Sequence, residues 1–169
     1  CKELLFVVER EADGREPLVR CINFGLDGMQ SFSFTLEEER SAVLVPAGQV
    51  GTYLYEPNAS VLKAGAFKQI AVRTGVKKLQ VNSHLYTADH LVSDFPGRRF
   101  RVDEVLSFTG KLCKGLSKTI PQANITVRNF PLSVEELRKR TKITDGGHVY
   151  LFATTLVDGE KVLVKCSKA

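Results

Sequence analysis

The sequence lacks the motifs by which the common enzyme classes are recognised. It contains no G-x-G, G-x-S-x-G, H-E-x-x-H or G-K-[ST] pattern, and its 13 glycines are dispersed. A methyltransferase, kinase or dehydrogenase of the doubly wound type needs a glycine-rich loop after its first strand. The three histidines (His84, His90 and His148) have no evident catalytic partner nearby in the sequence, so structural or surface roles are expected for them. The residues therefore indicate no complete active site.

Long apolar runs and paired cysteines are also lacking. No stretch of 18 apolar residues occurs, and the first residues show no basic segment followed by an apolar one, so no membrane span or signal peptide is expected. The four cysteines, Cys1, Cys21, Cys113 and Cys166, form no C-x-x-C pair. Scattered buried thiols in a reducing cytoplasm explain this spacing better than a metal site or a disulfide framework. A cytoplasmic protein without a metal is expected.

Charge is distributed unevenly along the chain. Residues 1–50 hold 5 Lys/Arg and 9 Asp/Glu, a net of −4, whereas residues 51–169 hold 19 and 10, a net of +9; together they give the formal net charge of +5. A basic segment of this size favours an anionic partner, with nucleic acid as the first candidate. The alternative is a lysine-rich domain that binds nothing.

The first 50 residues predict many strands and little helix. Apolar runs and turn signals predict strands at 4–8, 18–24 and 29–34. Thr35 and Glu38 fit a capping box, which predicts a short helix at 36–41. Such a segment is typical of the edge of a larger sheet, so we expect it to be less protected than the remainder of the chain.

From Gly51 onward, helices and strands alternate. A strand is predicted at 52–55, a helix at 58–73 that ends at Gly75, and short strands at 76–81 and 84–87. The remaining elements are a strand at 99–108, helices at 110–118 and 133–141, a strand at 124–128, and a hairpin of 148–156 with 161–166. This order predicts a small α+β sandwich with its helices on one face and the other face open.

Three basic features fall within residues 98–142, which hold 11 basic and 4 acidic residues. They are an Arg-Arg-Phe-Arg strand, a helix with lysines at i, i+3 and i+7, and a basic cluster at the end of the next helix. Each feature alone is common on a solvated surface, but together they favour a patch that contacts phosphates. The candidate nucleic-acid-binding residues are Arg98, Arg99, Arg101, Lys111, Lys114, Lys118, Arg138, Lys139 and Arg140.

Lys63 is a less direct candidate. On a helical wheel it lies between Phe67 and Ile70, where it interrupts the apolar side of the helix predicted at 58–73. Either its ammonium group reaches water along an apolar stem, or it pairs with Glu56 or an incoming phosphate near the helix N-terminus.

Several strings resemble a bacterial family of class I S-adenosylmethionine-dependent methyltransferase-like proteins. The strings are Tyr-Leu-Tyr-Glu-Pro-Asn-Ala-Ser-Val-Leu-Lys-Ala-Gly-Ala-Phe at 53–67 and Phe-Pro-Gly-Arg at 95–98. That family has a ferredoxin-like segment after its Rossmann domain, and then a THUMP-like domain. Residues 129–136, 145–147 and 150–154 resemble the THUMP-like part, and residues 1–5 resemble a late strand of the methyltransferase domain.

The resemblance implies three parts: a strand-rich remnant of the Rossmann methyltransferase domain (1–50), a ferredoxin-like segment (51–97) and a THUMP-like β-α-β-α-β-β sandwich (98–169). It implies an RNA-binding accessory region, with tRNA a common ligand of THUMP domains, that positions substrate for a catalytic domain absent from this chain. The parent protein would use S-adenosylmethionine, whereas the chain itself would bind no cofactor and transfer no methyl group. Because no aromatic-rich RRM signature occurs, backbone and shape recognition is expected. A docking or dimerisation module that binds no nucleic acid is the alternative.

Overall fold

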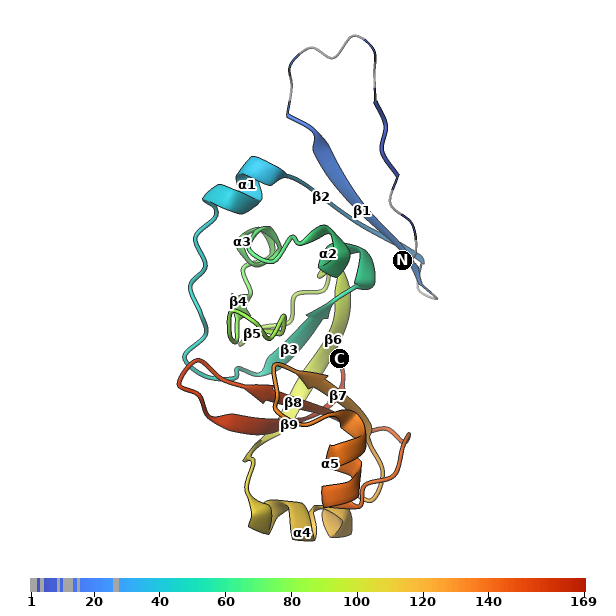
Figure 1. Cartoon of the computed structure of the whole chain (residues 1–169), viewed down its shortest axis with the longest axis vertical. Coiled ribbons are helices and arrows are strands. Elements are labelled where there is room, and N and C mark those ends of the chain that lie inside the picture. The colour runs from blue at the N-terminus through green and yellow to red at the C-terminus, as the bar shows by residue number, and fades with distance from the viewer. Residues whose placement is uncertain (1–2, 4, 9, 11–13, 15, 26–27) are drawn as a thin grey trace.

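The computed structural model describes residues 3, 5–8, 10, 14, 16–25 and 28–169. Within them a two-stranded sheet, β1-β2, stands beside a seven-stranded sheet with the order β4-β5-β3-β6-β9-β8-β7 (Figure 1). All strand pairs are antiparallel except β7 with β8. The elements are β1 (Leu18–Gly25), β2 (Gly28–Thr35), α1 (Leu36–Ser41), β3 (Tyr53–Pro57), α2 (Ala59–Ala64), α3 (Gln69–Thr74), β4 (Lys77–Lys78), β5 (Tyr86–Ala88), β6 (Gly97–Ser107), α4 (Gly110–Thr119), β7 (Asn124–Arg128), α5 (Val134–Thr141), β8 (Tyr150–Thr155) and β9 (Lys161–Lys168).

Strand β6 connects the two halves of the large sheet. Its first residues pair with β3, from Gly97 opposite Pro57 to Arg101 opposite Tyr53, and from Phe100 onward it pairs with β9. The expected boundary between residues 97 and 98 therefore lies inside one strand, and a single sheet runs through both expected units. The division of the chain into three parts stays a prediction.

The C-terminal order predicted from the sequence is confirmed. β6, α4, β7, α5, β8 and β9 follow one another as expected, and both helices lie against one face of the sheet. There Leu116 of α4 and Leu137 of α5 join Leu151 and Leu163 of the strands in one buried cluster. Burial of these apolar side chains is the main force that holds the helices to the sheet.

The expectation that the opposite face stays open is wrong. Phe152 and Val164 point to that face and are buried together with Leu79 and Leu85 from the segment between β4 and β5. Phe100 of β6 completes the packing, with its ring centroid 4.9 Å from that of Phe152. An apolar sheet face exposed to water is unfavourable, and here the segment between β4 and β5 buries it. Local sequence patterns do not reveal this packing, because the segment is distant in the sequence from β8 and β9.

The single helix expected at 58–73 is two helices. Gly65 adopts a left-handed conformation with φ of 76° and ends α2. The carboxylate of Glu39, from a distant part of the chain, caps the start of α3. It accepts hydrogen bonds from the backbone N–H groups of Lys68, at 2.9 Å, and Gln69, at 2.8 Å. Glycine tolerates the left-handed turn at no steric cost, which is why the chain can break there.

The two strands predicted within 18–34 and the capping box at Thr35 and Glu38 are confirmed. The inner face of the β1-β2 hairpin carries Cys21 and Phe34, which are buried in a cluster with Tyr55 and Ile70. Its outer face leaves Phe24 and other apolar side chains exposed. The strand expected at 4–8 is not present: residues 5–8 are exposed and lie in no strand, and residue 4 lies outside the described part.

The described residues of the chain contain no helix long and apolar enough to cross a membrane. No group of three or more His, Cys, Asp or Glu side chains among them is placed to hold a metal ion. Cys21, Cys113 and Cys166 are free and buried, as the sequence predicts; Cys1 lies outside the described residues.

Candidate nucleic-acid interface

Helix α4 presents three of the predicted lysines to solvent. The side chain of Thr109 accepts a hydrogen bond from the N–H of Leu112 at 3.1 Å and so caps the start of the helix. Cys113, Leu116 and Ile120 are buried on the side that faces the sheet. The opposite side therefore carries Lys111, Lys114 and Lys118, all exposed.

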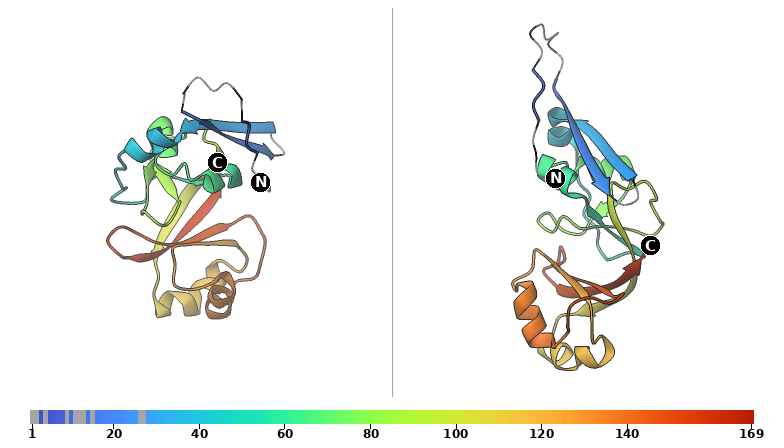
Figure 2. Two further views of the ribbon diagram at one scale, coloured as in Figure 1. Left: turned by 45° about the horizontal axis from the view of Figure 1, so that its top comes forward. Right: turned by 90° about the vertical axis from the view of Figure 1, so that its right-hand side faces the viewer.

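Helix α5 adds two further exposed cations beside them. Its start is fixed by the capping box of Ser133 and Glu136, and Leu137 anchors it in the same core as α4. Lys139 and Arg140, in its last turn, are exposed. Figures 1 and 2 show α4 and α5 together at the end of the molecule opposite the β1-β2 hairpin.

These five side chains form what we call the α4-α5 basic face: Lys111, Lys114, Lys118, Lys139 and Arg140. None of the five makes an ion pair with another described residue. Hydrogen bonds with the backbone and with Ser133 lower the pKa of the Glu135 and Glu136 carboxyls most; the nearby charge of Lys139 lowers the pKa of both further, and that of Arg140 adds to this at Glu136. Exposed cations outside ion pairs contribute little to stability, and they remain available to an anion from solution.

Three other predicted arginines are engaged within the fold. Arg98 pairs with Glu56, Arg99 donates to the carbonyl of Ser93, and Arg138 pairs with Asp145. Arg138 also donates to the carbonyls of Ala123 and Ile143, both at 3.3 Å. Its guanidinium group therefore ties the end of α5 to the following loop, and it does not belong to the basic face.

The remaining predicted cations lie on elements other than α4 and α5. Arg101 is exposed on β6, opposite Ser167 of β9 and Tyr53 of β3. Lys63 is exposed in the last turn of α2. The proposed pairing of Lys63 with Glu56 is wrong, because the carboxylate of Glu56 binds Arg98 and Arg128.

Sequence reasoning missed a buried lysine on the edge strand β4. Lys78 is 3% exposed, and its Nζ donates to the carbonyl of Val81 at 2.7 Å. The same atom lies 3.3 Å from Nδ1 of His84 and 4.9 Å from the ring centroid of Phe67, on which His84 stacks. Burial lowers the pKa of Lys78, and burial together with the charge of Lys78 lowers the pKa of His84. The packing of His84 agrees with the structural role expected for it.

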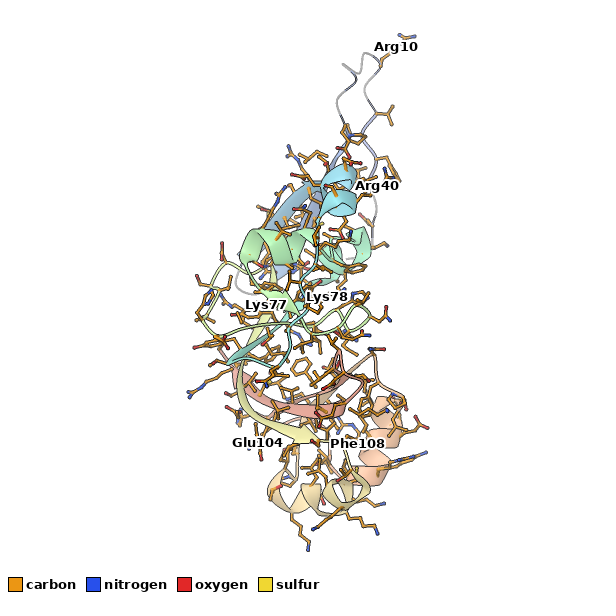
Figure 3. The ribbon with its side chains drawn as sticks, turned by 90° about the vertical axis from the view of Figure 1, so that its left-hand side faces the viewer. Arg10, Arg40, Lys77, Lys78, Glu104 and Phe108 are labelled. Atoms are coloured by element: carbon orange, nitrogen blue, oxygen red, sulfur yellow. The ribbon has the colours of Figure 1, made fainter. Side chains whose placement is uncertain are left out.

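The sequence also gave little reason to single out Phe108. This half-buried residue follows β6 and lies beside α4, where Figure 3 labels it. With Gly110, Cys113, Lys114 and Arg140 it lines a hollow of about 200 Å³. An aromatic residue directly after a strand, one residue before a helix cap, is the only sequence signal for this position.

Comparison with known proteins agrees with this architecture. Residues 53–96 match a family of ferredoxin-like domains, and residues 97–168 match a THUMP domain-like family. A solved structure from Porphyromonas gingivalis W83, described as a "putative methyltransferase", shares 47% sequence identity with a TM-score of 0.86. The match covers 90% of this chain and 38% of that one, so the chain spans well under half of the length of that protein. No curated protein matches the chain. The chain therefore contains a ferredoxin-like domain followed by a THUMP-like domain, and it is similar to part of a longer protein described as a "putative methyltransferase".

Proposed function

We propose that the chain is an RNA-binding accessory region that positions an RNA substrate for an S-adenosylmethionine-dependent methyltransferase domain of the same protein. The α4-α5 basic face carries the proposal, because its five cations come from two helices held on one sheet and pair with no described residue. Phosphate groups are the anions that such a surface binds in RNA, by releasing condensed counterions. The THUMP-like domain supports RNA as the ligand.

A second candidate function is docking onto the catalytic domain. The outer face of the β1-β2 hairpin exposes Ile22, Phe24 and Met29, and the exposed residues 5–8 are also apolar. Exposed apolar groups of this kind mark interaction surfaces. In this view residues 1–50 complete the edge of a Rossmann methyltransferase domain, and docking by itself requires no nucleic acid. The hairpin and the basic face lie at opposite ends of the molecule, so both functions can operate together (Figure 2).

Salt dependence tests the RNA proposal. If the five cations of the basic face each contact a phosphate, log K against log salt should slope at about −3.5 to −4.5, from about 0.7–0.9 per contact. The Lys114→Ala variant should reduce the slope by about 0.7–0.9 and weaken binding to all RNA sequences alike. Fluorescence anisotropy with labelled tRNA, measured over a series of salt concentrations, gives both quantities.

The matched control for Lys114→Ala is Lys77→Ala, which removes an exposed lysine from β4, far from α4 (Figure 3). It should leave the slope unchanged, and both variants should keep the stability of the parent within about 0.5 kcal/mol. A flat salt response, or no binding at about 50 mM salt, would contradict the RNA proposal and leave docking as the function.

The proposal also assigns cofactor binding to the catalytic domain and not to this chain. The sequence has no glycine-rich loop between a strand and a helix, which is where such a domain holds its cofactor. Calorimetric titration of the chain with S-adenosylmethionine should therefore show no binding at millimolar concentration. An intact class I methyltransferase serves as the positive control, and a micromolar Kd for the chain would overturn the assignment.

A further inference from the structure

The hollow beside α4 combines an aromatic wall with cations from two helices. Phe108 supplies the wall, Lys114 of α4 and Arg140 of α5 are exposed at its edge, and Gly110 leaves one side open. A Cβ atom added to Gly110 would meet no atom within 4 Å. The hollow is therefore accessible from solvent next to the α4-α5 basic face.

Phe108 is held in place by the sheet and by a second aromatic residue. Its N–H donates to the carbonyl of Lys161 at 2.7 Å, which continues the pairing of β6 with β9. Its ring contacts that of Phe130 edge to face, with centroids 5.0 Å apart and an interplanar angle of 79°. A ring fixed in this way loses little conformational entropy when a ligand packs against it.

The remaining wall residue offers no reactive group. Burial of Cys113 raises the pKa of its thiol, although the charge of Arg140 acts in the opposite direction. The thiolate is the nucleophilic and metal-binding form of cysteine, and a buried thiol with a raised pKa is inert. The hollow is therefore suited to binding and not to covalent chemistry.

The size and charge of the hollow limit its ligand. Its volume of about 200 Å³ lies below the ~300–1,000 Å³ that is usual for sites that enclose a drug-sized molecule. A single planar heterocycle suits this space and stacks on an aromatic ring, and the phosphates on either side of it would meet Lys114 and Arg140. A duplex keeps its bases stacked inside and has no free base to offer.

We propose that this hollow receives one unpaired nucleobase of the bound RNA, stacked against Phe108, while Lys114 and Arg140 hold the adjacent phosphates. This inference rests on the proposed RNA-binding function and adds to it a preference for single-stranded RNA. The sequence predicts that the chain recognises the backbone and shape of RNA, and the inference adds a contact with one base.

The test compares a labelled single-stranded RNA with an oligonucleotide of the same length and phosphate count that lacks bases. The 169-residue chain should bind the RNA with bases about tenfold more tightly, which is within the range for stacking of one base on an aromatic side chain. Phe108→Ala should remove this difference and leave the salt slope unchanged, since it removes no phosphate contact. Lys114→Ala should do the reverse: it lowers the slope and keeps the preference for bases.

Two further variants keep the result interpretable. Phe108→Leu retains an apolar group against Phe130 but no ring, so it should lose the preference even if Phe108→Ala folds poorly. Val105→Ala removes an exposed apolar side chain from β6, three residues before Phe108, and should change nothing. Circular dichroism melting shows whether each variant is folded.

Equal affinity for the RNA with bases and the RNA without them would overturn the nucleobase site, while salt-dependent binding would still support the basic face. The nucleobase site would also be overturned if a polyglutamate peptide bound as tightly as the single-stranded RNA. That result would assign the hollow to an acidic protein partner. If neither oligonucleotide binds at low salt, the proposed RNA-binding function itself fails. This outcome can be distinguished from equal binding of the two oligonucleotides and from binding of polyglutamate.

Discussion

Replacement of Glu56 by alanine should lower the free energy of unfolding by about 3 kcal/mol, at the low end of the cost of breaking a buried ion pair. Glu56 is 4% exposed, and its carboxylate joins three strands. One oxygen lies 2.7 Å from Nη2 of Arg128 at the end of β7, and the other lies 2.8 Å from Nε of Arg98 on β6. Without the carboxylate, both guanidinium groups lose the anion with which they pair.

The low end of the range applies because the arginines are not fully buried. The side chain of Arg98 is 52% exposed and that of Arg128 is 38% exposed, so water can solvate part of each charge after the substitution. A fully buried charge left without a partner would be more costly.

Urea unfolding measures the change in the free energy of unfolding. Two glutamine variants, Glu56→Gln and Glu104→Gln, serve as a matched pair that each remove one negative charge. Glu56→Gln keeps the shape of the side chain and removes its charge, and it should lose more than half of what the alanine variant loses. Glu104→Gln removes an exposed carboxylate from the same sheet (Figure 3) and should change stability by less than about 0.5 kcal/mol. Equal effects at the two positions would show that the ion pairs of Glu56 do not hold the strands together.

The string Tyr-Glu-Pro-Asn, which carries much of the resemblance seen in the sequence, therefore has a structural explanation. Tyr55 is buried and its hydroxyl donates to the carbonyl of His90 at 3.0 Å. Glu56 holds the two arginines, and Asn58 caps α2 by accepting from the N–H of Val61 at 3.1 Å. Asn58 also donates to the side chain of Gln30 on the hairpin, at 2.9 Å. The string joins the parts of the fold.

Elements with short-range signals could be predicted from the sequence. The two capping boxes, at Thr35 with Glu38 and at Ser133 with Glu136, each involve residues three positions apart, so the pattern itself contains the contact. Helix α4 was predictable for a similar reason, since lysines and buried residues alternate at helical spacing. Residues that lie close in sequence determine all three features.

Features that depend on distant residues could not be predicted. The ion pair of Glu56 with Arg128 joins residues 72 positions apart, and the start of α3 depends on Glu39, 29 positions before Lys68. The periodicity of a helix or strand shows which face a cation occupies, but not which carboxylate it meets. For that reason the sequence analysis grouped Arg98 and Arg138 with the exposed lysines as candidate phosphate contacts. In the structure Arg98 pairs with Glu56 and Arg138 pairs with Asp145.

Two glycine-to-alanine substitutions should change stability in opposite directions, although the chemical change is the same. A Cβ atom at Gly97 would fall on the carbonyl oxygen of Glu56 and lie 2.8 Å from Cα of Pro57. Those atoms belong to the backbone of β3, which is paired with β6 at this point. The next N–H of the chain, that of Asn58, donates to the carbonyl of Pro96 at 3.0 Å, so β3 cannot move away without losing hydrogen bonds. Gly97→Ala should therefore lower the free energy of unfolding by about 3 kcal/mol, near the upper end of the usual cost of overpacking.

Gly115 is the matched position, because it lies inside α4 and a Cβ atom there would meet nothing within 4 Å. Alanine should raise the free energy of unfolding by about 0.5–1 kcal/mol at this site, since glycine is the poorer helix former. Thermal unfolding of the two variants beside the parent chain shows the sign directly, with a lower Tm for Gly97→Ala and a higher one for Gly115→Ala. A shift of both in the same direction would contradict the close approach of β6 to β3 at Gly97, because that contact is what distinguishes the two sites.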